Sequence, residues 1–412
     1  MKNSKNLKLI FELLIPLSLS LLIFILSKNQ GNWFSFWHSL SIPAQIPFSD
    51  LKAHIHFYDC FKNEINIYLN ECYLIPDGNA KISTHPKIWI YLVNFLNLQK
   101  EYIYNIFIIT VYTIYFYFLI KLFLEFKEIK SRIFFIIFFI STTNFILIER
   151  FSTDIFIFII VFFVLNIKKN YLKSLLILFG VSLKYYPIFL LSIFIINKKY
   201  LLLNCLFFFL FISIFYFDQI KLVSENILEV ALIIAYGART LAKAFYHLSI
   251  EYDFFVTDQN YHYFKNFIIL LTSLYCLVIF ITGYLFSKIK INNISNNFEI
   301  YFISGASLYI GTFIIGSNFD YRLIFLILTI PYIININNFY LKFLLITSIT
   351  ISINSFLFQH SEYLFLSEIN HWIYYTKAAF VYLCKFLILS FLCFLLGSNL
   401  KKKNFLSLND KK

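Results

Sequence analysis

Charged residues are scarce in this chain. Only 14% of its 412 residues are Asp, Glu, Lys or Arg, whereas 60% are hydrophobic. A soluble protein of this length would divide into two or three domains with charged surfaces. Here apolar runs recur along the whole chain, and the charges lie in the gaps between them. The composition therefore predicts a polytopic membrane protein, an all-α helical bundle that forms a single domain over 1–412.

Metal-ligand clusters of Cys and His are also absent from the sequence. His54, His56 and His85 have no carboxylate in register, so we expect no metal and no cofactor. Four of the six cysteines lie inside apolar runs and serve as small hydrophobic residues. Cys60 and Cys72 share a polar loop, where a disulfide is possible if the loop faces an oxidising compartment.

The basic residues indicate membrane topology and not nucleic-acid binding. The net charge is +13, but the lysines cluster at the ends of apolar runs and form no basic stripe. Lysines before the run 9–26 place the N-terminus in the cytoplasm, and that run is long enough for one crossing of ~30 Å of hydrocarbon. The same accounting predicts about twelve crossings with both termini cytoplasmic, including a cytoplasmic tail at 398–412. It also predicts outer loops at 27–85 and 218–265, the first bearing interfacial helices, and a short dipping segment at 87–98.

Two hairpins bring charges to the outer side. Between Arg132 and Lys168 the apolar stretch is interrupted by a polar tip at 149–154. A second hairpin turns at Lys184, where Pro187 breaks the helix and where a lysine in lipid would be costly. Short helices of this kind are stable only inside a bundle, so their turn is expected to line a wet cavity.

Asp50, in the first outer loop, is the candidate reacting carboxylate, and Asp59 is its chief rival. The tip at 149–154, Lys184 and a later charged tip at 316–322 fall on the same predicted side. Only four of the 35 basic residues are arginines, and three of these lie in or beside outer polar segments. A guanidinium binds phosphate in two places at once, so retained arginines favour a phosphate site.

This set of groups suits a lipid-linked phosphate substrate whose tail stays in the bilayer. Asp50 would act as general base on an acceptor hydroxyl, while Lys184 and Arg322, with Arg150 behind them, would bind the donor phosphate. One base and one displacement would invert the anomeric carbon. The expected partners are a polyprenyl-phosphate sugar donor, a lipid or glycan acceptor and membrane lipids, with no nucleic acid.

Five short elements occur in order over roughly 1–340: Ser49-Asp50-Leu51, His85-Pro86-Lys87-Ile88-Trp89, Glu149-Arg150-Phe151-Ser152-Thr153-Asp154, Lys184-Tyr185-Tyr186-Pro187 and Asn318-Phe319-Asp320-Tyr321-Arg322. The ordered set resembles the GT-C superfamily of membrane glycosyltransferases, in its polyprenyl-phosphate-mannose-dependent branch. The chain departs from the family pattern where Phe151-Ser152 replaces Gly-Asn and where His85 replaces Tyr. The resemblance implies a GT-C fold, an active site on the extracytoplasmic side of the cell membrane, and substrate contacts from Glu149, Asp154, Tyr186, His85, Asn318, Asp320 and Tyr321.

Simpler interpretations stay open at this stage. Asp50 could cap an interfacial helix, the tip at 149–154 could be a self-paired solvated turn, and Lys184 could reach the interface without a ligand. Arg322 and Asp320 could form a structural ion pair. Alternative functions are a transporter or flippase of lipid-linked sugars, and a polysaccharide polymerase or ligase that uses a diphosphate donor.

Overall fold

The described part of the chain is almost entirely helical. The computed structural model describes residues 2–409 apart from 43–45, 70–71, 73–82, 196–197, 216–221, 224–234, 252–255, 258, 290, 292–293, 317 and 358–370. The all-α class is confirmed, and the named strands in the described ranges are two short ones, β1 (Ala235–Tyr236) and β2 (Asn318–Phe319). Parts of the outer loops expected at 27–85 and 218–265, and the end of the tail expected at 398–412, lie outside the described residues.

The chain divides into two compact units, which are described separately. The first comprises 1–132, 145–188 and 202–227, and the second 133–144, 189–201 and 228–412. The first holds α1 (Lys2–Ser27), α2 (Gln30–Ser39), α3 (Ser49–Lys62), α4 (Ile88–Phe95), α5 (Glu101–Glu125), α8 (Asp154–Asn166) and α9 (Asn170–Leu183). The second holds α12 (Ala238–Glu251), α13 (Tyr261–Phe286), α14 (Asn296–Ile315), η2 (Asp320–Thr329), α15 (Ile330–Ile334), α16 (Phe339–Ile353) and α18 (His371–Asn409). Four elements pass from one unit into the other: α6 (Ile129–Phe139), α7 (Thr142–Arg150), η1 (Tyr186–Phe194) and α10 (Lys198–Phe215).

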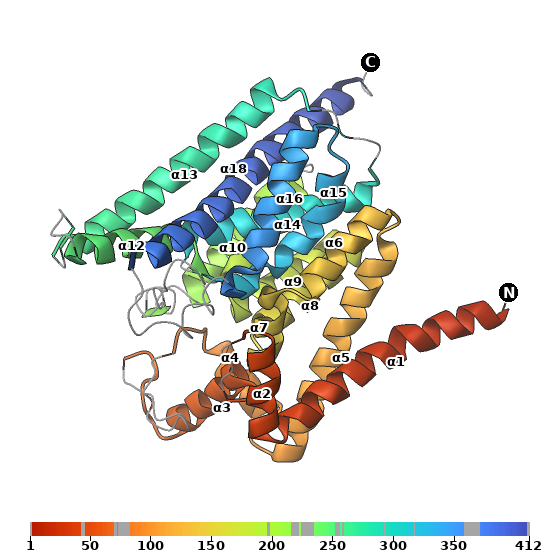
Figure 1. The fold of residues 1–412 in the computed structure, drawn as a ribbon, viewed down its shortest axis with the longest axis vertical. Coiled ribbons are helices and arrows are strands. Elements are labelled where there is room, and N and C mark those ends of the chain that lie inside the picture. The colour runs from red at the N-terminus through yellow and green to blue at the C-terminus, as the bar shows by residue number, and fades with distance from the viewer. Residues whose placement is uncertain are drawn as a thin grey trace. The chain divides into compact units, whose positions relative to one another are not determined.

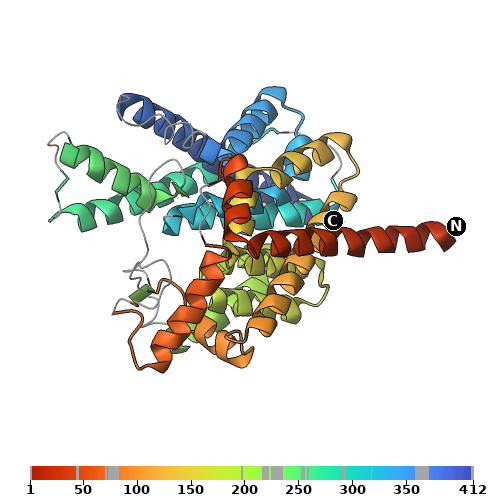
Figure 2. The ribbon, with the colours of Figure 1, turned by 60° about the horizontal axis from the view of Figure 1, so that its bottom comes forward.

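Several helices are long and apolar enough to cross a membrane. By length and composition there are four among the described residues, namely Glu101–Glu125, Tyr261–Phe286, Asn296–Ile315 and Thr376–Lys402. The number rises to six if two bent helix pairs each count as one crossing. One of these pairs is α1 with α2, where the chain direction bends by 118°, a sharp bend that is visible in Figure 2. A membrane protein is therefore supported, whereas twelve crossings are not confirmed.

In the first unit, α1 and α5 lie side by side and run in opposite directions (Figure 1). The Ser20 hydroxyl is 2.8 Å from the Thr113 hydroxyl, and the Lys28 ammonium is 3.7 Å from the Glu101 carboxylate. The end of α1 therefore meets the beginning of α5. This is the arrangement expected when a chain leaves through one crossing and returns through the next.

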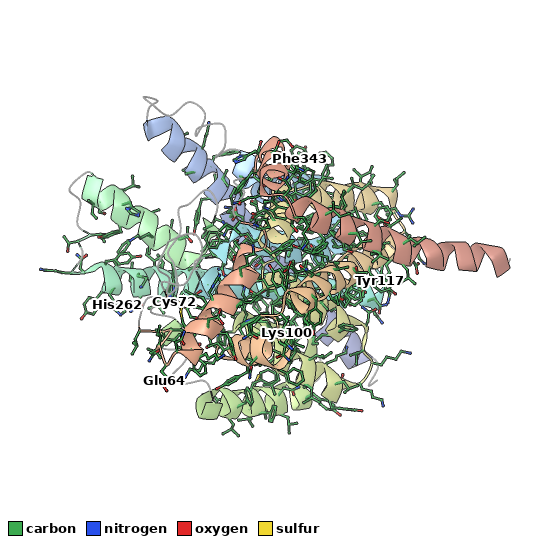
Figure 3. All side chains as sticks on the ribbon, turned by 90° about the horizontal axis from the view of Figure 1, so that it is seen from below. Glu64, Cys72, Lys100, Tyr117, His262 and Phe343 are labelled. Atoms are coloured by element: carbon green, nitrogen blue, oxygen red, sulfur yellow. A yellow bond between two sulfur atoms is a disulfide. The ribbon has the colours of Figure 1, made fainter. Side chains whose placement is uncertain are left out.

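The loop that was predicted to be the first outer one contains a disulfide. Cys60, in the last turn of α3, is bonded to Cys72, with 6.2 Å between their Cα atoms. Figure 3 draws the side chains of this region and labels Cys72. Both cysteines are buried in a cluster with Phe57, Ile67 and Tyr68. The disulfide that the sequence left open is therefore present. The segment at 87–98 holds only the eight-residue α4, which is too short for an ordinary crossing, as expected.

In the second unit, α13 and α18 lie against each other along their lengths (Figure 1). A Cβ atom on Gly283 would lie 2.1 Å from the Phe394 carbonyl oxygen, and one on Gly397 would lie 2.1 Å from that of Phe280. The two helices therefore touch backbone to backbone. They run in the same direction, because the Tyr275 hydroxyl lies 2.8 Å from that of Ser390 and, further along both helices, the Ser287 hydroxyl lies 2.7 Å from that of Ser398. Close approach at small residues is how helices associate in lipid, where the hydrophobic effect does not drive them together.

Two apolar segments of the predicted α-helical bundle are 3-10 helices. They are η1, of nine residues, and η2, of ten. Such runs rarely exceed three or four residues, because their hydrogen bonds are poorer than those of an α-helix. Their rise is ~2.0 Å per residue, compared with ~1.5 Å in an α-helix, so they extend further for the same number of residues. Each begins at a polar motif that the sequence singled out.

Candidate active site

Asp50 lies in the first turn of α3, in the first unit. The helix begins after Phe48, which adopts a left-handed backbone conformation with φ 60°. A carboxylate in the first turn is favoured by the partial positive charge of a helix N-terminus. The Phe48 backbone N–H donates to the Glu149 carbonyl at 3.3 Å. This bond connects the start of α3 with the end of α7, and therefore the Asp50 region with Arg150.

The structure brings Asp50, Arg150 and Lys184 together in this unit, although they are far apart in sequence. Burial raises the pKa of the Asp50 carboxyl above its ordinary value. The charges of Arg150 and Lys184 and the nearby Ser152 hydroxyl act in the opposite direction, and the charge of Asp154 adds to the increase. Asp50, a half-buried residue, therefore lies within electrostatic reach of two cations.

Lys184 is held by a buried carboxylate. It follows α9 in an extended conformation, and its Nζ donates to Asp154 Oδ2 at 2.5 Å. The Tyr186 hydroxyl donates to Asp154 Oδ1, and the Ser152 hydroxyl donates to Oδ2 at 3.2 Å. Asp154 is completely buried, so its visible role is to fix Lys184 and Tyr186. A contact of Asp154 or Tyr186 with substrate stays a prediction.

The tip at 149–154 is not a solvated turn. Glu149 and Asp154 are both completely buried, and the interpretation as a self-paired exposed loop is wrong for these two carboxylates. Phe151 has φ 52° in the left-handed region, at the position where the resembled pattern has glycine. Glycine adopts this conformation without strain, whereas a phenylalanine needs its surroundings to hold it there. The chain therefore has the turn that a glycine would favour, with an aromatic side chain in its place.

An aromatic group lies one turn along α3 from Asp50. The His54 ring stacks on Trp89 at 4.5 Å between centroids and meets His85 edge-on at 4.7 Å. Trp89 is fixed in turn, because its Nε1 donates to the Leu183 carbonyl at 3.1 Å. Burial, and secondly the charge of Lys184, lowers the pKa of His54 to about 3, so its ring is neutral.

The later charged tip lies in the second unit. Asp320 is completely buried and pairs with Lys385 at 2.7 Å, and it also accepts a hydrogen bond from the Ser355 hydroxyl. Arg322 donates instead to the side chain of Asn318, and its guanidinium lies 6.0 Å from the ring centroid of Tyr321. The structural ion pair between Arg322 and Asp320 is therefore not formed.

Lys385 is a buried charged residue that the sequence reasoning overlooked. It lies in α18 within the candidate crossing Thr376–Lys402, is completely buried, and also donates to the Ala235 carbonyl at 3.0 Å. The sequence does contain a signal for Lys385, because a lysine inside an apolar run is costly in lipid unless it is paired. The same argument had singled out Lys184. The partner of Lys385 could not be found this way, since it depends on which helices pack together.

The residues that the structure describes contain no group of three or more His, Cys, Asp or Glu that could hold a metal ion. Comparison of the chain with protein-family models, with characterised proteins and with solved structures finds no match. The case for a function therefore depends on the geometry of these side chains.

Proposed function

We propose that the protein is an inverting glycosyltransferase of the GT-C type, with about twelve crossings of the cytoplasmic membrane and both termini in the cytoplasm. It transfers a monosaccharide, a mannose-like hexose, from a polyprenyl-phosphate donor to a hydroxyl of a lipid or glycan acceptor. The reaction takes place at the extracytoplasmic face. The Cys60–Cys72 disulfide supports that side for the first outer loop, since disulfides persist in oxidising compartments.

The observation that carries the proposal is the placement of Asp50 within electrostatic reach of Arg150 and Lys184. A general base works best when its pKa is close to the working pH. Burial moves the pKa of Asp50 upward, in that direction, while the two cations favour its ionised form. A base beside fixed positive groups is what the attack of a hydroxyl on a sugar phosphate requires.

In the proposed step, Asp50 takes the proton of the acceptor hydroxyl as that oxygen bonds to the anomeric carbon. The bond from this carbon to the phosphate oxygen breaks, and its electron pair leaves with the phosphate. Positive side chains stabilise the developing charge on the phosphate. Attack and departure on opposite faces of the sugar invert the anomeric centre.

Two of the proposed phosphate ligands lie in the first unit. Lys184 already pairs with Asp154 at 2.5 Å. Arg150, the last residue of α7, is proposed to lie behind it. Arg322 remains a proposed phosphate ligand from the second unit. His85, Glu149, Asn318, Asp320 and Tyr321 remain proposed to position the substrate.

The test uses the full chain reconstituted in liposomes with polyprenyl-phosphate hexoses labelled in the sugar. We expect transfer to an acceptor lipid extract, and loss of that transfer by ~10²- to 10⁴-fold in Asp50→Asn, with donor binding retained. Asp59→Asn is the matched control, because Asp59 lies on the same helix ~13.5 Å further along its axis. It should transfer sugar at the wild-type rate.

Three results would contradict the proposal. Transfer by Asp50→Asn at the wild-type rate would remove Asp50 as the base. Movement of labelled donor to the opposite leaflet, without any glycosylated product, would identify a flippase instead. Activity with a diphosphate donor alone would favour the polymerase or ligase alternative.

A further inference from the structure

We propose that Tyr112, in the middle of α5, is a positioning residue that holds Arg150 beside Asp50. The catalytic consequence of this inference rests on the proposed function, whereas the placement rests on contacts within the first unit alone. No motif in the sequence pointed to Tyr112, and α5 contributes no group to the proposed reaction.

Asp50 and Arg150 each lie within two positions of a residue whose backbone is left-handed. Phe48, with φ 60°, lies two positions before Asp50, and Phe151, with φ 52°, directly follows Arg150. Positive φ is uncommon for residues other than glycine, and for a bulky residue it persists only where the surrounding structure holds it. Both rings are almost completely buried. The backbone directions that place Asp50 and Arg150 therefore depend on what surrounds these two phenylalanines.

Tyr112 touches both of them. Its ring centroid lies 6.0 Å from that of Phe48 and 4.9 Å from that of Phe151, in the second case nearly edge to face at 75°. The two phenylalanine rings are 6.0 Å from each other, so the three rings form a closed triangle. Such pairs stabilise packing beyond the area they bury. One side chain of α5 thus braces both left-handed residues.

The hydroxyl of Tyr112 adds a polar bond at the end of α7. It donates to the carbonyl of Ile148, two residues before Arg150. This carbonyl also accepts from the Phe151 backbone N–H at 3.1 Å. The last carbonyls of a helix lack partners within the helix, and the Ile148 carbonyl has these two beyond it. The next carbonyl, that of Glu149, accepts from the Phe48 backbone N–H at 3.3 Å. The final turn of α7 is therefore fixed by α5 on one side and by the start of α3 on the other.

Loss of the hydroxyl should let the end of α7 move, and Arg150 with it. The charged groups that act on Asp50 are Arg150 from α7, Lys184 after α9 and Asp154 from α8. His54, on its own helix, is neutral. Because Arg150 favours the ionised carboxylate, its retreat would make Asp50 hold its proton to a higher pH.

The experiment measures this protonation directly and does not need catalysis. The hydrophobic reagent dicyclohexylcarbodiimide reacts with protonated carboxyl groups, and the modified Asp50 peptide is quantified by mass spectrometry as a function of pH. Arg150→Gln sets the scale and should raise the labelling midpoint by ~1 to 3 pH units, the usual effect of removing a nearby charge. Tyr112→Phe keeps the ring and removes only the hydroxyl. It should raise the midpoint in the same direction by a part of that amount.

Tyr309→Phe is the matched control. The Tyr309 hydroxyl is also buried and donates to a helix carbonyl, that of Lys385, at 2.7 Å, but in the second unit. Its labelling midpoint should equal that of the wild type. A wild-type midpoint in Tyr112→Phe, together with a raised one in Arg150→Gln, would overturn the proposal, and so would a raised midpoint in Tyr309→Phe.

Failure of the proposed function would be recognised separately. If the wild type transfers no sugar, the labelling midpoints still report whether Tyr112 holds Arg150 beside Asp50. If it does transfer sugar, the acid limb of the kcat/KM profile should move to higher pH in Tyr112→Phe by the same amount as the labelling midpoint. If Tyr112→Phe instead lowers kcat equally at every pH and leaves the acid limb of the kcat/KM profile in place, Tyr112 has a merely structural role and the inference is contradicted.

Discussion

The neutral His54 makes a quantitative prediction about acid stability. The ring is 3% exposed, stacks on Trp89, and has no acceptor for its Nε2 among the described residues. Protonation would place a charge in this buried position, next to Lys184. We therefore compare the wild type with His54→Phe, which keeps an aromatic ring on Trp89 and cannot titrate.

The magnitude follows from the difference between the folded and unfolded pKa values. The pKa of His54 is about 3 in the folded protein, against an ordinary value of 6.5. A lowered folded pKa means that the stabilisation is complete above 6.5 and is lost as the pH falls from 6.5 toward 3. When the pH is lowered from 7.5 to 5, proton binding at His54 in the unfolded state lowers the free energy of unfolding by ~2 kcal/mol. The free energy of unfolding of the wild type should fall by that much more than that of His54→Phe.

The assay is reversible unfolding by sodium dodecyl sulfate in mixed micelles, at pH 7.5 and at pH 5. All other titrating groups are common to both proteins and cancel in the comparison. His262→Gln is the control, because His262 is an exposed histidine in the first turn of α13, and it should follow the wild type. Parallel losses of stability in wild type and His54→Phe would show that His54 is not held neutral by burial.

Three further predictions concern other parts of the molecule. Because Asp50 must be ionised to accept a proton and burial raises its pKa above 3.8, kcat/KM for sugar transfer should rise with pH through that pKa, as a pH–rate profile would show. Lys385→Met should destabilise the fold by ~3–5 kcal/mol by leaving Asp320 as an uncompensated buried charge, and the added change Asp320→Leu should recover most of this in the same unfolding assay. Replacing Cys60 and Cys72 by serine should cost ~2–4 kcal/mol, and reductant should lower the stability of the wild type but not of this variant.

The sequence singled out Asp50, Arg150 and Lys184 as candidates, each from its local context. Asp50 lies in a long polar loop, Arg150 in a polar interruption of an apolar stretch, and Lys184 at a turn where a lysine in lipid would be costly. The structure brings these three together. The role of Asp154 as the partner of Lys184 was not foreseen, since a pairing across 30 positions depends on how α8 packs on α9.

Conformation was the weaker part of the prediction. The left-handed backbones of Phe48 and Phe151 contradict the local preference of phenylalanine, so no propensity argument could find them. Both rings pack against Tyr112, a tertiary contact that the local sequence does not reveal. The 3-10 form of η1 and η2 was missed for a similar reason, because apolar runs of this length do not distinguish one helix type from another.

The 3-10 helix η2 affects how crossings in this chain should be counted. Its first residue, Asp320, pairs with Lys385 of α18, and Tyr332 of the following α15 accepts a hydrogen bond from Asn399 at 3.2 Å. From Lys385 to Asn399, α18 rises by ~21 Å along its axis, at ~1.5 Å per residue. The segment 320–332 therefore advances ~21 Å along α18, although neither η2 nor α15 is long enough to meet a test based on helix length. This distance is about two thirds of a ~30 Å hydrocarbon layer, so a count of crossings should consider consecutive short helices together.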